Sequence, residues 1–137
     1  MIKRAQEHVD IAWSWACIIR GTDCRNIIKP LVAYTDDLSR ESQGRYMVGS
    51  GMVEVALAYY GDRYSIVVMV HEMTHYLQYL ERGGRPRTIT ERCRDEMQAF
   101  SADDTIAHYL GLDTHPDAFT WGSVASAYGC TSDLLER

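Results

Sequence analysis

The sequence predicts an α+β fold, in which a small, twisted, mostly antiparallel sheet packs against one central helix and two to three further helices. Apolar residues recur at helical spacing in residues 2–19 and again in 66–80. Between them, residues 52–60 read "MVEVALAYY", a β-branched and aromatic run typical of a strand. A chain of 137 residues is long enough to bury one core, so we expect a single domain over residues 1–137.

The first half of the chain predicts one helix followed by strands. Residues 2–19 form an amphipathic helix pattern. Residues 27–37 predict a strand, and Pro30 favours the beginning or an edge position for it. Residues 39–51 are polar and rich in Gly, so we expect a loop or hairpin connection before the strand at 52–60.

The second half predicts helices only. A helix begins near Asp62 or Ser65, either of which can cap it, and stops at Gly83-Gly84. Thr88 and Glu91 have the spacing of a capping box, which predicts a helix that starts near Thr90 and ends at Gly111. A fourth helix is expected over 115–128, with Pro116 in its first turn.

Charge and hydropathy exclude two function classes. The net charge is −5 and the pI about 5.4, which is atypical of a nucleic-acid binder. No apolar run reaches the ~18 residues of a membrane span. The first 20 residues do not read as a secretory signal, so we expect a cytoplasmic protein with reduced thiols. Disulfides Cys17–Cys24 and Cys93–Cys130 would instead indicate a secreted or virion-associated protein.

The string His71-Glu72-Met73-Thr74-His75 is an H-E-x-x-H motif within the predicted central helix. His71 and His75 are four residues apart, so they share one helix face and can reach one metal ion. Glu72 is rotated by ~100° from His71, which suits a carboxylate beside a metal-bound water better than a further ligand. Zinc lowers the pKa of such a water, and a neighbouring carboxylate can take its proton. Two ordinary histidines on an amphipathic helix are the alternative interpretation.

A catalytic zinc site usually has a third protein ligand. The pattern H-E-x-x-H-x-x-G-x-x-H fails, because residue 78 is Gln and residue 81 is Glu. We therefore expect a carboxylate from the next helix. Glu96 is preferred because small residues follow it and allow close helix packing, while Glu91 and Asp95 remain open. Asp103 or Asp104 could accept a hydrogen bond from a ligand histidine.

The motif followed by Glu96 in "EMQA" resembles the gluzincin metallopeptidases, the thermolysin-like zincins, in a minimal single-domain form. The resemblance covers residues 52–104. It implies that His71, His75 and Glu96 bind zinc and that Glu72 is the general base. It also implies that residues 52–60 supply the edge strand that binds the substrate backbone. Phe100 stands where the relatives have an aspartate that contacts a ligand histidine, and we expect no counterpart of their C-terminal helical domain.

The relatives also use a later Tyr or His to stabilise the oxyanion. His115 is our preferred candidate, and His108, Tyr109 and Tyr128 are the others. A group of arginines between the two site helices predicts either a solvated loop or a preference for acidic substrates or a carboxylate terminus. These are Arg82, Arg85, Arg87, Arg92 and Arg94.

The function that follows is hydrolysis of peptide bonds in a peptide or protein substrate by a Zn²⁺-dependent metallopeptidase, with neither nucleic acid nor membrane as partner. One alternative is a catalytically inactive zinc-binding scaffold, such as a regulatory or virion protein. Another is a metal-free structural domain.

Overall fold

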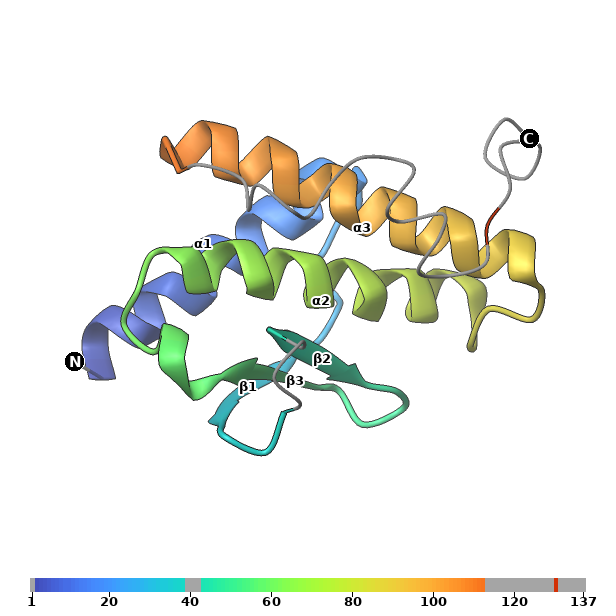
Figure 1. Cartoon of the computed structure of the whole chain (residues 1–137). Coiled ribbons are helices and arrows are strands. Elements are labelled where there is room, and N and C mark those ends of the chain that lie inside the picture. Colours follow the sequence, from blue (N-terminus) through green and yellow to red (C-terminus); the bar gives the residue numbers. More distant parts are fainter. Residues whose placement is uncertain (1, 39–42, 113–129, 131–137) are drawn as a thin grey trace.

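The computed structural model describes residues 2–38, 43–112 and 130, and its elements confirm the α+β class (Figure 1). They are α1 (Ile2–Arg20), β1 (Leu31–Thr35), β2 (Gly44–Met47), β3 (Met52–Ala56), a 3-10 turn (Leu57–Tyr59), α2 (Tyr64–Arg82) and α3 (Ile89–Leu110).

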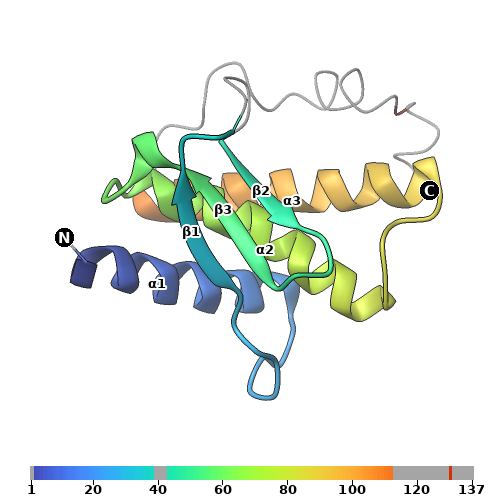
Figure 2. The same ribbon diagram turned by 90° about the horizontal axis from the view of Figure 1, so that it is seen from below.

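Helix α2 is the centre of the molecule. Seen from the side of the sheet, it lies behind the strands and between α1 and α3 (Figure 2). It is therefore covered on several sides, and Met69, Met73 and Leu77 are completely buried. The expected apolar stripe holds along most of this helix, but its last member, Leu80, is 44% exposed. The stripe fails there because the final turn of α2 extends beyond the packed core.

The sheet has the strand order β1-β3-β2. Strand β3 pairs in parallel with β1 and antiparallel with β2. The expectation of a mostly antiparallel sheet was therefore wrong, because one of the two pairings is parallel. A tight connection through Gly49 and Gly51, both with positive φ, folds β3 back between β1 and β2. The middle position explains why Val53 and Val55 are fully buried.

The strand predictions differ from the structure in three places. β1 covers only Leu31–Thr35 of the predicted 27–37. β3 ends at Ala56, and residues 57–59 form a 3-10 turn instead of continuing the predicted strand. Residues 44–47, predicted as part of a loop or hairpin connection, form β2. Residues along β2 alternate between half-buried and exposed, because successive side chains point to opposite faces and one face lies against α2. The short, glycine-containing sequence of β2 gives no clear sign of a strand. β1 does begin directly after Pro30, as expected for an edge strand.

Three of the four ends of α2 and α3 use the residues that the sequence indicates, but the N-cap of α2 is Arg63, which makes no side-chain capping bond, and not Asp62 or Ser65. Asp62 Oδ1 accepts a hydrogen bond from the backbone N–H of Tyr64 at 2.8 Å. Thr88 Oγ1 accepts one from the N–H of Glu91 at 3.1 Å. The Glu91 carboxylate binds the N–H of Arg87 and not that of Thr88, so the capping box is only half formed. Gly83 and Gly111 end α2 and α3 in the left-handed conformation. The predicted helix at 115–128 lies outside the described residues.

Two disulfides correct the expectation of reduced thiols. Cys17 pairs with Cys24 and Cys93 with Cys130, with Cα–Cα distances of 6.2 and 5.9 Å. Such bonds persist in oxidising compartments and do not fit the cytoplasmic location expected from the sequence. Among the described helices, none is both long enough and apolar enough to cross a membrane.

Candidate metal centre

The two motif histidines project from the middle of α2 toward α3. They are one turn apart, and their ring centroids are 5.0 Å from each other. The helix face that carries them is neither solvent-exposed nor filled with apolar side chains, since both rings are only partly buried in a mixed polar setting. This arrangement leaves one nitrogen of each ring free to face the same point in space.

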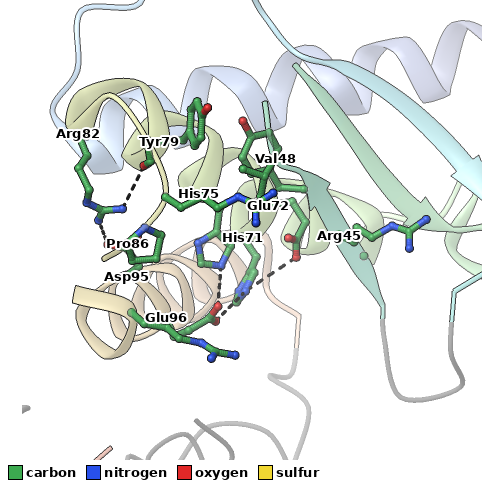
Figure 3. A pocket seen from close by; sticks show the side chains of 15 residues that line it. Arg45, Val48, His71, Glu72, His75, Tyr79, Arg82, Pro86, Asp95 and Glu96 are labelled. Atoms are coloured by element: carbon green, nitrogen blue, oxygen red, sulfur yellow. Dashed lines mark hydrogen bonds and ion pairs between the residues drawn. The ribbon is translucent and has the colours of Figure 1, made fainter. Parts of the chain in front are cut away.

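Glu96 of α3 meets these rings (Figure 3). Its Oε1 lies 3.2 Å from His75 Nε2, and its Oε2 lies 3.7 Å from His71 Nε2. One donor atom from each of the three residues falls within 4.8 Å of the others. In a tetrahedral zinc site with ligand bonds of ~2.0–2.1 Å, ligand atoms are roughly 3.3 Å apart. The cluster therefore has the size and the donor chemistry of a site for a divalent metal.

The other ring nitrogens are held by residues behind the cluster. His71 Nδ1 lies 2.9 Å from Asp103 Oδ2, and His75 Nδ1 lies 2.9 Å from Gln78 Oε1. Both acceptors favour hydrogen on Nδ1, so Nε2 is the atom of each ring that would coordinate a metal. Asp103 thus provides the contact that the sequence suggested for it. Phe100 packs edge-on against the His71 ring at 4.7 Å between centroids.

The electrostatics of the cluster favour a cation at its centre. Burial would lower the pKa of His71, but the carboxylates of Asp103 and Glu72 hold that pKa well above 6.5. Burial would likewise raise the pKa of Glu96, but the two imidazoles keep it below its ordinary value. Glu96 Oε2 is buried without a hydrogen-bond partner among the described residues. Such an atom is costly to bury unless a cation meets it.

Glu72 shares a pocket of about 350 Å³ with the cluster. Its Oε2 lies 3.9 Å from His71 Nε2, and Figure 3 shows its carboxylate beside the histidines and not between them and Glu96. That position matches the one expected from the ~100° offset along the helix. A carboxylate there can exchange a proton with a molecule held at the cluster without itself being a ligand.

The two other candidates for the third ligand are occupied elsewhere. Arg82 makes a short ion pair with Asp95, and its Nε lies 3.5 Å from Glu91 Oε2. Both carboxylates therefore face the C-terminal end of α2, one turn or more beyond the histidines. Of the three acidic residues considered, the structure brings Glu96 alone into the cluster.

Of the four residues proposed to stabilise the oxyanion, the structure describes two, and neither lies at the pocket. His108 and Tyr109 lie at the C-terminal end of α3 and do not line the pocket. The Tyr109 ring packs at a tilt against Trp15, with the ring centroids 4.3 Å apart. His115 and Tyr128 lie outside the described residues.

Several residues at the pocket were missed from the sequence. Strand β2 contributes Gly44, Arg45 and Tyr46 to the wall, and Val48 follows them. The expectation that residues 52–60 supply the edge strand was wrong, because β3 is the central strand and β2 is the edge strand at the pocket. Gln78 was also passed over, although its position three residues after His75 is the spacing of neighbours on a helix face.

No protein-family model, curated protein or solved structure matches this chain. The site must therefore be interpreted from its own geometry and chemistry.

Proposed function

We propose that this protein is a minimal, gluzincin-like zinc metallopeptidase that hydrolyses peptide bonds. The single observation that carries the proposal is the convergence of His71, His75 and Glu96 on one point, with Glu72 in the same pocket. A metal with structural purpose alone needs neither an adjacent acid outside the ligand set nor an open pocket. The hydrogen bonds of Asp103 and Gln78 add support, because orienting contacts of this kind accompany metal-binding histidines.

Zn²⁺ held by these three residues would supply a Lewis acid and lower the pKa of a water molecule. Glu72 is the general base in this proposal. It takes the proton of the attacking water and delivers it to the leaving amine nitrogen, which must be protonated before it departs. Burial of Glu72, 9% exposed, keeps the proton from exchanging freely with bulk solvent. His115 remains our predicted donor to the oxyanion.

Strand β2 offers a surface for the substrate backbone. It is an edge strand, and three of its residues line the pocket. An extended peptide could add to this edge through main-chain hydrogen bonds, which would lay its scissile carbonyl across the cluster. The half-buried Tyr46 and Tyr79 contact each other beside the path of such a peptide, with ring centroids 6.0 Å apart.

The test combines metal analysis with peptide cleavage. We expect purified protein to bind one zinc per chain and to cleave members of a diverse peptide library. Glu72→Gln should keep the zinc and lose about 10²–10⁴-fold in kcat/KM, because a general base contributes that much. Glu96→Gln should lose the zinc. Glu7→Gln, an exposed change on α1, is the matched control and should alter neither quantity.

Two results would contradict the proposal. Unchanged turnover in Glu72→Gln would remove its assigned role. Bound zinc with no cleavage across the library would favour the alternative of a catalytically inactive zinc-binding scaffold, such as a regulatory or virion protein.

The disulfides bear on where this chemistry would take place. We propose an oxidising location, either secreted or virion-associated, because both cysteine pairs are joined. Thiol titration of the protein isolated from its source, under denaturing conditions, would find no free thiol among the four cysteines if this is correct.

A further inference from the structure

The wall of the pocket carries an excess of positive side chains. Four arginines line it against three carboxylates, although the whole protein has a net charge of −5. The arginines are Arg45, Arg82, Arg85 and Arg92, and the carboxylates are Glu72, Asp95 and Glu96. A cleft with charge opposite to that of the chain favours negatively charged ligands, because its low-dielectric walls strengthen the local field.

Two of these guanidinium groups already have carboxylate partners in the protein. Arg82 is paired with Asp95, and Arg45 Nη2 lies 2.6 Å from Glu54 Oε1. Figure 3 shows Arg82 and Arg45 on opposite sides of the cluster formed by His71, His75 and Glu96. Their partners neutralise them and fix their positions, so these two residues shape the pocket more than they attract a ligand.

Arg85 differs from both. It is exposed, it lines the pocket, and it forms no hydrogen bond or ion pair within the described part of the chain. Its backbone is held on both sides. Gly83 ends α2 in the left-handed conformation, and Pro86 restricts the residue before it to an extended conformation. The loop therefore presents to the pocket a guanidinium that has no partner among the described residues.

We propose that Arg85 is a specificity-determining residue, which binds a carboxylate of the substrate near the scissile bond. The planar guanidinium fork can hold a carboxylate through two parallel hydrogen bonds, which an amide of the same shape cannot match in charge. The carboxylate belongs to an acidic side chain or to the C-terminus of a peptide. This inference rests on the proposed peptidase function and names the substrate class for it.

The experiment compares peptides that differ only in charge, using the zinc-loaded full chain. In the first set, each pair of peptides carries Glu or Gln at one position near the cleaved bond, and each such position is varied in turn. In the second set, the two peptides differ only in a free or an amidated C-terminus. The readout is the ratio of kcat/KM for the charged over the neutral member. We expect Arg85→Gln to lower that ratio about tenfold, the effect of losing one charge-assisted pair. Arg87→Gln is the matched control, because Arg87 is in the same loop and exposed but does not line the pocket.

The two sets of peptides distinguish the two possible sources of the carboxylate. A fall with the first peptide set identifies side-chain recognition, and a fall with the second identifies the C-terminal carboxylate. Equal effects of Arg85→Gln and Arg87→Gln, or no effect of either, would overturn the proposal. If no peptide is cleaved, the peptidase function fails. Fluorescence anisotropy of the same labelled peptides then tests carboxylate binding by itself, and a ratio of affinities unaffected by Arg85→Gln overturns the inference as well.

Discussion

Gly44, the first residue of β2, lies so close to α2 that a single methyl group should disturb Glu72, the proposed general base. A Cβ placed there would be 2.6 Å from Val68 Cγ1, 3.0 Å from the carbonyl oxygen of Glu54 and 3.3 Å from Glu72 Cγ. Carbon atoms in contact are normally ~3.5–4.0 Å apart. In Gly44→Ala the contact with Val68 must therefore lengthen by roughly 1 Å, and the Glu72 side chain must give way by a few tenths of an ångström.

The expected magnitudes follow from this displacement. Forcing a methyl group into a packed contact costs about 1–3 kcal/mol of unfolding free energy. A misplacement of ~1 Å in a catalytic group can cost about 10²-fold in rate, which is the upper limit for the smaller shift of Glu72. Zinc content should stay the same, because the three atoms nearest to the added Cβ belong to none of the three candidate ligands. We therefore expect Gly44→Ala to lose kcat/KM for peptide cleavage while it keeps its metal.

The assay measures urea unfolding, zinc per chain and kcat/KM for one peptide. Gly84→Ala is the matched control, since Gly84 also lines the pocket, has no positive φ and would place its Cβ in open space. It should match the wild type in unfolding free energy. If Gly44→Ala also matches the wild type in stability and turnover, the close approach of β2 to Glu72 has no functional weight and the reasoning is refuted.

Two further predictions concern groups behind and away from the site. Asp103→Ala should lower zinc affinity about 10–100-fold in a competition titration, because it removes the acceptor of His71 Nδ1–H; Asp104→Asn, an exposed neighbour, should not. His8 is buried, and burial with the charge of Arg4 lowers its pKa below 6.5. The unfolded chain then binds the proton more tightly, so stability present above pH 6.5 should be lost as the pH falls below it. The other charged groups around His8 are Glu7, Asp62 and Arg63. Urea unfolding at several pH values should show that the unfolding free energy of the wild type decreases below pH 6.5 and that it decreases less in His8→Gln. The same decrease in both proteins would contradict this role of His8.

The helices were predictable because local signals determine them. Apolar spacing marked α1 and α2, the Thr88–Glu91 spacing marked α3, and Thr88 and Gly83 marked ends that the structure reproduces within one or two residues. The sheet was less predictable. Whether β3 lies in the middle or at the edge depends on which strand pairs with which, and pairing partners leave no trace in the sequence of one strand.

The same division applies to the site. His71, Glu72 and His75 follow from one turn of one helix, and Glu96 was favoured by the small residues after it. The pocket wall formed by Gly44 and Tyr46 could not be predicted, because both residues belong to β2, a strand that the sequence did not indicate. Glu91 and Asp95 are not ligands because both carboxylates lie against Arg82 of α2. This contact across the turn between α2 and α3 depends on the packing of the two helices and not on a local sequence pattern.

The placement of the cluster across two consecutive helices has a consequence for the order of assembly. α2 by itself can offer only two imidazoles, and Glu96 joins them after the turn at residues 83–88 has closed and α3 has docked. Tight metal binding would therefore report that the helical hairpin is complete, and partly folded chains would hold the ion weakly. Only 20 residues separate His75 from Glu96, so this closure is local and can come early in folding. Metal binding would therefore stabilise the docked pair of helices α2 and α3 relative to forms in which α3 has separated from α2.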